Sequence, residues 1–226
     1  MPAPSHNTSL LISMHMEKCG GTSLDRLLRA EFGDGFYLYD PGPPEVRGNP
    51  EFPDGTQCVH GHMFFGLHQY FPQRICNYIT LLRDPIDRFL SNFEHIRNHE
   101  HPLHLMAIGD AGLERFCSES GARHYRNLFV RRLAGVRDEI EQADLVRAEQ
   151  NLRTFAVVGV LEDANAFTRA CVKRFGWQDG QLEISNATPG ARRKISDCSD
   201  ADHRRVLAAN DWDLQLMRRI EDLLAR

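Results

Sequence analysis

The sequence lacks the features that mark several specialised classes of protein. No apolar run approaches the roughly 18–20 residues of a membrane-spanning helix, and residues 1–9 show no secretory signal peptide. The six cysteines form no CxxC pair and no regular spacing, which argues against a zinc ribbon and a disulfide framework. The formal net charge is −4, so no overall positive field attracts nucleic acid or an anionic membrane. We therefore expect a cytoplasmic protein that binds any anion through a local group of residues.

The pattern that is present is typical of an α/β protein. The chain has 226 residues, 42% of them hydrophobic and 26% charged, which suits one globular domain. No repeat or linker divides it, so we expect a single domain over residues 1–226. Apolar runs typical of buried strands cover residues 9–15, 57–60, 77–82 and 155–161. Helical patterns include Leu24, Leu27 and Leu28, and then residues 86–99, 139–153, 163–175 and 200–224. This alternation predicts a mostly parallel central sheet flanked by helices.

Polar segments follow three of the predicted strands, at residues 15–23, 60–62 and 83–88. The carboxyl ends of parallel strands share one edge of a sheet, and ligands bind in the crevice beyond it. We therefore expect the three segments to meet at one site.

The first segment has the composition of a phosphate-binding loop. Gly20 and Gly21 permit close approach to the backbone, and the following helix offers N–H groups and the positive end of its dipole. Lys18 adds a charge, whereas Thr22 and Ser23 add hydroxyl donors and one of them is expected to cap the helix. The lysine precedes the glycines, so this is not a Walker A loop. By itself the segment also fits an ordinary strand-to-helix turn.

The other two segments supply a cation and a base. Arg83 leaves the end of a strand, and Ser91 lies about two turns into the next helix, so the pair suits a second phosphate. His60 and His62 flank a glycine at another strand end, where an imidazole can remove a proton from an alcohol. The sequence does not rank the two histidines. We favour His62 as the base and His60 as its support.

These segments resemble the motifs of sulfotransferases that use 3′-phosphoadenosine 5′-phosphosulfate (PAPS). Residues 16–23 resemble the PKTGGTS loop of this family, and residues 82–91 resemble its RDPxxRxxS segment. Residues 59–68 resemble its HGH element. The likeness is to the branch related to heparan sulfate 2-O-sulfotransferases and their bacterial relatives. The resemblance implies a P-loop-like sulfotransferase architecture. It also implies that Arg83 and Ser91 hold the 3′-phosphate of PAPS. The resemblance further implies that the loop binds the 5′-phosphosulfate of PAPS through Lys18, Cys19, Gly20, Gly21, Thr22 and Ser23. The sequence departs from the pattern at two positions, where Glu17 replaces proline and Cys19 replaces threonine.

Three further groups of residues have two interpretations each. A late loop resembles the segment that closes over the 3′-phosphate and contributes Thr188, Arg192 and Lys194, but it equally fits a surface turn. A basic stretch suits either an anionic acceptor or an exposed helix face, and comprises Arg123, Arg126, Arg131 and Arg132. A histidine-rich stretch fits a substrate-facing rim or plain surface better than a metal site, and comprises His95, His99, His101 and His104.

We therefore predict transfer of a sulfuryl group from PAPS to an acceptor hydroxyl, with Lys18 stabilising charge and no metal required. The resemblance points to a carbohydrate acceptor. One alternative is a non-catalytic nucleotide- or glycan-binding protein on the same scaffold, because fold does not dictate function. Another is an atypical ATP-dependent kinase, although no acidic metal ligand follows a strand. The acceptor and the oligomeric state stay open at this point.

Overall fold

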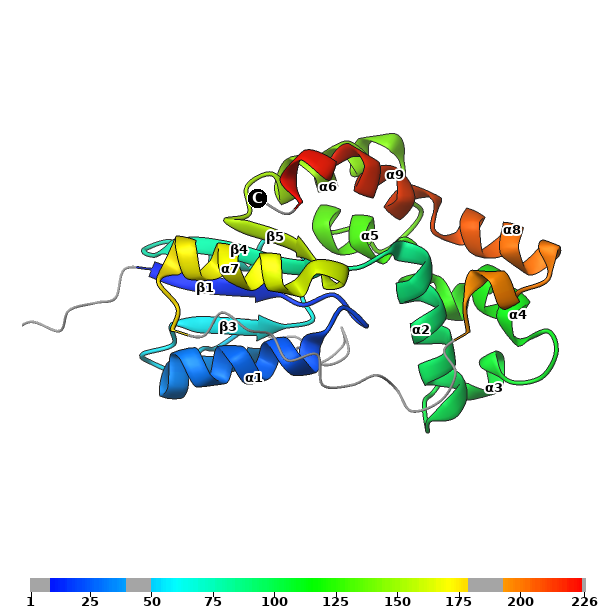
Figure 1. The fold of residues 1–226 in the computed structure, drawn as a ribbon, viewed down its shortest axis with the longest axis horizontal. Coiled ribbons are helices and arrows are strands. Elements are labelled where there is room, and N and C mark those ends of the chain that lie inside the picture. The colour runs from blue at the N-terminus through cyan, green and yellow to red at the C-terminus, as the bar shows by residue number, and fades with distance from the viewer. Residues whose placement is uncertain (1–8, 40–49, 179–192, 225–226) are drawn as a thin grey trace, which may run out of the picture.

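The computed structural model describes residues 9–39, 50–178 and 193–224, and its centre is a parallel sheet (Figure 1). Five strands pair in the order β2-β3-β1-β4-β5, and every pairing is parallel. The strands are β1 Ser9–Met14, β2 Phe36–Tyr39, β3 Cys58–Gly61, β4 Ile75–Leu82 and β5 Val157–Val160. The predicted α/β class with a mostly parallel sheet is confirmed.

Helices cover both faces of the sheet, which explains why its central strands β3, β1 and β4 are mostly buried. On one face, Leu11 and Ile79 pack against α1 (Gly21–Phe32) and α7 (Ala164–Phe175). On the other face, Leu10 and Ile12 belong to the cluster that includes α5 (Leu128–Ala134), α6 (Gln142–Leu152) and α9 (Asp211–Arg219). Alternate residues of β1 therefore face opposite helical layers.

A second group of helices stands beyond the carboxyl ends of the strands, at the right of Figure 1. It has its own apolar cluster, which includes Phe89, Phe93, Phe116 and Val206. The helices are α2 Pro85–Asn98, α3 His104–Ala107, α4 Gly112–Ser118 and α8 Asp200–Ala209. Asp84 caps α2, because its Oδ1 accepts hydrogen bonds from the N–H groups of Ile86 (3.0 Å) and Asp87 (2.9 Å). This cap directs α2 across the edge where the polar segments end.

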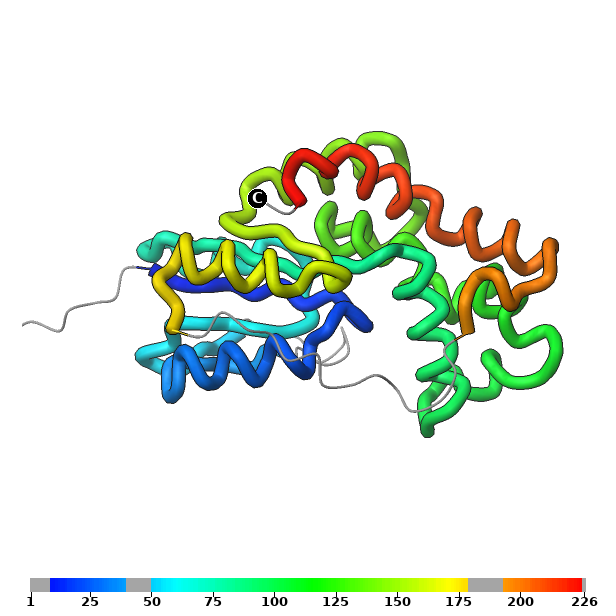
Figure 2. Tube along the Cα trace, viewed as in Figure 1, coloured from blue at the N-terminus to red at the C-terminus, as the bar shows by residue number. Residues whose placement is uncertain are grey.

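The structure differs from the predicted elements in several places. The strand β2, which has only four residues, was not predicted, and neither were the short helices α3, α4 and α5. The single helix predicted over residues 200–224 is wrong: α8 ends at Ala209, α9 begins at Asp211, and a 3₁₀ turn covers Glu221–Leu223 (Figure 2).

The break between α8 and α9 has a tertiary cause. The buried Asn210 at this break accepts a hydrogen bond from Arg88 Nη2 at 3.2 Å. The carboxylate of Asp213 accepts bonds from the N–H groups of Phe129 (3.1 Å) and Val130 (2.9 Å) at the start of α5. These bonds to distant segments outweigh the local preference for one continuous helix. Within the described ranges, no helix is long and apolar enough to cross a membrane.

Candidate active site

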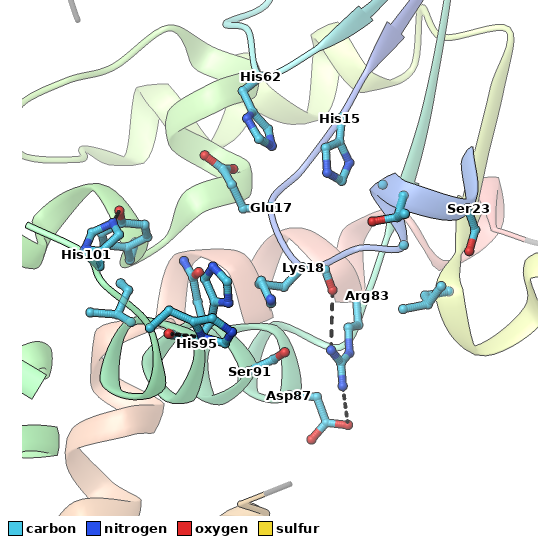
Figure 3. A pocket seen from close by; sticks show the side chains of 18 of the residues that line it. His15, Glu17, Lys18, Ser23, His62, Arg83, Asp87, Ser91, His95 and His101 are labelled. Atoms are coloured by element: carbon cyan, nitrogen blue, oxygen red, sulfur yellow. Dashed lines mark hydrogen bonds and ion pairs between the residues drawn. The ribbon is translucent and has the colours of Figure 1, made fainter. Parts of the chain in front are cut away.

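The three polar segments line one cavity of about 900 Å³ between the carboxyl ends of the strands and α2 (Figure 3). It contains a cationic end, five histidines and several hydroxyl groups. Of the predicted site residues, the lining includes Lys18, Gly20, Gly21, Thr22, Ser23, His62, Arg83 and Ser91. Cys19, His60 and Lys194 lie outside the lining, whereas Thr188 and Arg192 fall outside the described residues.

The loop between β1 and α1 has a backbone that suits anion binding. Lys18 and Gly20 both adopt the left-handed conformation, with φ of 67° and 78°. Gly20 is the N-cap residue, and the described residues supply no side-chain cap to α1. The prediction that Thr22 or Ser23 caps the helix was therefore wrong, because both lie within its first turn. The start of α1 thus presents its backbone N–H groups at the cavity.

Gly21 is required by a close contact that the sequence did not reveal. A Cβ atom at this position would lie 2.0 Å from Nε2 of His15, so any larger residue must displace that imidazole. His15 follows β1 and also lines the cavity. The glycine therefore lets a histidine pack directly against the anion-binding loop.

Cys19 is oriented away from the predicted phosphate site. It is fully buried in the core cluster that β1 forms with α5, α6 and α9, and burial raises the pKa of its thiol. Its Sγ donates a weak hydrogen bond to the carbonyl of Glu17 at 3.7 Å. The cysteine thus acts as a small apolar residue that anchors the loop to the core.

Arg83 connects the two predicted anion-binding segments. Its side chain is buried at the end of β4, and Nη1 donates a hydrogen bond to the carbonyl of Lys18 at 3.4 Å. Its guanidinium also forms long ion pairs with Asp87 (3.7 Å) and Glu162 (3.9 Å). Ser91 lines the same cavity from α2.

Three histidines form a stack at the carboxyl ends of β1 and β3. The ring centroid of His15 lies 5.4 Å from that of His60 and 4.8 Å from that of His62. His60 is only 2% exposed, its Nδ1 pairs with Ser13 Oγ at 2.9 Å, and burial lowers its pKa to about 4. Burial, with added repulsion from His62 and then His60, holds the pKa of His15 well below its ordinary value. Both rings are therefore neutral at pH 7, and His62 reaches the cavity beside them.

His15 lies in the predicted polar segment 15–23 but was not named as a site residue, because it also ends the apolar run 9–15. A usable signal was present, since His60 and His62 also occupy a strand end. Polar residues at the carboxyl end of a parallel strand merit inspection even when they continue an apolar run.

Glu17, the first departure from the resembled loop, is paired inside the cavity wall. Its Oε1 accepts a short hydrogen bond from Nη2 of Arg132, and the two side chains are 18% and 16% exposed. Burial raises the pKa of Glu17, but Arg132 and then His62 outweigh it, so the net pKa is lowered. Arg132 is the member of the predicted basic stretch that contacts the loop.

The other basic residues of that stretch bond to nearby backbone. Arg126 donates to the carbonyl of Cys117 at 2.7 Å, and Arg131 donates to the carbonyl of Arg126 at 3.0 Å. Arg123 pairs with the exposed Asp138 at 3.6 Å. These contacts fit a structural role for most of the stretch.

The histidine-rich stretch contributes a rim on the α2 side. His95, His99 and His101 line the cavity together with Tyr125, whose hydroxyl lies 3.3 Å from Nε2 of His101. His104 does not line it and pairs with the carbonyl of Ile96 at 3.3 Å. Across the described part of the chain, no group of three or more His, Cys, Asp or Glu residues is arranged to hold a metal ion.

Two comparisons with known proteins give matches over nearly the whole chain. A family model described as "Sulfotransferase family" matches residues 6–224. Eight chains of solved structures match, among them mouse sulfotransferase SULT7A1 complexed with PAP. That chain is 14% identical with a TM-score of 0.33, and the match covers 95% of this chain and 84% of that one. No curated protein matches.

Proposed function

Since this chain belongs to the sulfotransferase family, we propose that it transfers a sulfuryl group from PAPS to a hydroxyl of a carbohydrate acceptor, as one domain over residues 1–226. The observation that supports this proposal best is the single cavity that contains Lys18, Arg83 and His62. It combines two anion-binding groups with a base, and each comes from a different strand end. The cytoplasmic location expected from the sequence stays a prediction.

The cavity fits a nucleotide with two anionic ends. Its volume of about 900 Å³ suits a ligand of that size. Lys18 and the start of α1 would hold one anionic group, and Arg83 with Ser91 would hold the other. The ion pairs of Arg83 with Asp87 (3.7 Å) and Glu162 (3.9 Å) are long, so a phosphate can replace them with shorter charge-assisted bonds.

When bound, PAPS supplies the sulfuryl group, and the residues of the chain provide position, charge and a base. Lys18 and the N–H groups of α1 stabilise negative charge that develops at the bridging oxygen. His62 removes the proton from the acceptor hydroxyl. The three strand ends place these groups around one cavity, and such positioning lowers the entropic part of the barrier.

The environment of the two candidate bases favours His62. His62 lines the cavity, whereas His60 is buried and bonded to Ser13. Its low pKa of about 4 also makes His60 a weak base. We therefore assign the proton transfer to His62 and the support of the histidine stack to His60.

The rim beside α2 suits a sugar. The rings of His95, His99, His101 and Tyr125 offer both flat apolar faces and hydrogen-bonding atoms toward the cavity. A polyhydroxyl acceptor needs both kinds of contact. This composition supports the carbohydrate acceptor that the motif resemblance implies.

The test is a transfer assay with ³⁵S-labelled PAPS against panels of glycans, lipids and small alcohols. We expect labelled product with a glycan and its loss in the His62→Ala variant. Calorimetry with adenosine 3′,5′-bisphosphate provides a measurement of nucleotide binding that needs no acceptor. Binding of the bisphosphate without transfer to any acceptor would favour a non-catalytic protein, and tighter binding of ATP with Mg²⁺ would favour a kinase.

A further inference from the structure

Glu17 is partly buried, and its carboxylate has an incomplete set of hydrogen bonds among the described residues. One carboxylate oxygen, Oε1, accepts from Arg132, whereas Oε2 is buried and receives no hydrogen bond from any residue that the structure describes. A buried charged oxygen without a donor is costly. Such a group is retained where the charge has another use.

The group that faces this carboxylate is the imidazole of His62. Glu17 and His62 extend from the ends of neighbouring strands β1 and β3, and in Figure 3 their side chains point toward one another. Both line the cavity of the proposed active site. His62 is also one of the groups that hold the pKa of Glu17 below its ordinary value. The two side chains are therefore neighbours at the edge of one cavity.

The remaining groups around His62 do not supply a negative charge. His15 stacks on it and His60 lies one ring further, and burial keeps both neutral at pH 7. Arg132 and Lys18 are cationic, and both act on the neighbouring His15. Among the described residues that face His62, Glu17 therefore provides the counter-charge for an imidazolium.

We propose that Glu17 is a positioning residue for His62, which orients the imidazole and stabilises the imidazolium formed during sulfuryl transfer. The inference rests on the proposed function. The acceptor O–H bond breaks and its proton goes to His62, while the acceptor oxygen bonds to sulfur. The bond from sulfur to the leaving bisphosphate breaks and the bisphosphate keeps the electron pair. Glu17 takes no proton.

Arg132 is the tether of this arrangement. Its guanidinium binds Glu17 and lies 5.0 Å from the ring centroid of Phe64. The contact holds Oε1 of the carboxylate, whereas Oε2 has no hydrogen-bond partner among the described residues. The replacement of the resembled proline by Glu17 thus adds a charged group that acts on the base, at the edge of an anion-binding loop.

The test is an NMR titration of the His62 imidazole, compared between the wild type and a Glu17→Gln variant. The His62 signal is assigned by its absence from the spectrum of a His62→Gln variant. The glutamine keeps the shape and the acceptor for Arg132 but removes the charge. We expect the midpoint of the His62 titration to move to lower pH by about one unit, a tenfold loss of proton affinity. The matched control is Asp138→Asn, which removes an exposed carboxylate from another arginine pair, and should leave the midpoint in place.

An unchanged midpoint in a folded Glu17→Gln variant overturns the proposal. Should that variant not fold, Glu17→Asp is the second test, because it moves the carboxylate away from His62 by one methylene group. We expect a smaller shift of the His62 midpoint in the same direction. An unchanged midpoint in a folded Glu17→Asp variant would also overturn the proposal. The titration needs neither PAPS nor an acceptor. A wild type that shows the coupling but transfers no sulfuryl group would refute the proposed function and leave the Glu17–His62 interaction standing. With an active acceptor, Glu17→Gln should lower kcat about tenfold or more and move the acidic limb of its pH profile to lower pH.

Discussion

The buried His60 should make the stability of the protein sensitive to acid. Its pKa is about 4 in the folded chain, against an ordinary value of 6.5. Between these two values the unfolded chain binds the proton and the folded chain does not. The free energy of unfolding therefore rises with pH across this window. Above about pH 6.5 neither state binds the proton, and His60 causes no further change in stability. Integration from pH 5 to pH 7.5 gives about 2 kcal/mol for this one group.

The assay is urea unfolding followed by far-UV circular dichroism at pH 5 and pH 7.5. The variant is His60→Asn, whose amide can replace Nδ1 in the bond to Ser13. We expect the difference in unfolding free energy between the two pH values to be about 2 kcal/mol smaller in the variant than in the wild type. Part of the pH dependence should persist, because burial lowers the pKa of His15 in the same direction. An equal pH difference in both proteins would refute the reasoning.

Three further predictions concern the anion-binding loops. Lys18→Ala should reduce the rate of sulfuryl transfer by about a hundredfold or more without altering the circular dichroism spectrum, and normal turnover with PAPS would contradict the assigned role. Gly21→Ala should lower both the Tm and the affinity for adenosine 3′,5′-bisphosphate, because its methyl group occupies the position of the His15 ring, with Cβ 2.0 Å from Nε2. Calorimetry and thermal melting test this, and an unchanged Tm and affinity would contradict the contact. Arg83→Gln should weaken binding of the bisphosphate by about 10- to 100-fold but leave binding of adenosine 5′-phosphate nearly unchanged, and an equal loss for both ligands would contradict a 3′-phosphate site.

The general arrangement of the site followed from one rule about parallel sheets. Lys18, His62 and Arg83 are far apart in the sequence, but each follows a strand, and parallel strands end at one edge. The structure brings all three to one cavity. The rule needs only the position and direction of each strand, and both were readable from short apolar runs.

The contacts that complete the site were not readable in this way. Glu17 and Arg132 are separated by 115 residues, and no periodicity relates them. The stacking of His15 on His62 depends on the register between β1 and β3. The sequence shows His15 only as the end of an apolar run. The break at Asn210 depends on a bond to Arg88 on another helix. Each of these features is decided by tertiary packing, which outweighs local preference.

The bond between Arg88 and Asn210 has a consequence for the order in which the site forms during synthesis. The two residues are 122 positions apart, and Arg88 belongs to α2, the helix that also carries Ser91. The loop after β1 and the end of β4 leave the ribosome well before Asn210, so α2 gains this anchor only after residue 210 has been made. Closing so long a loop is slow. We therefore expect the wall of the cavity formed by α2 to take its final position only when the segment between α8 and α9 has folded against it.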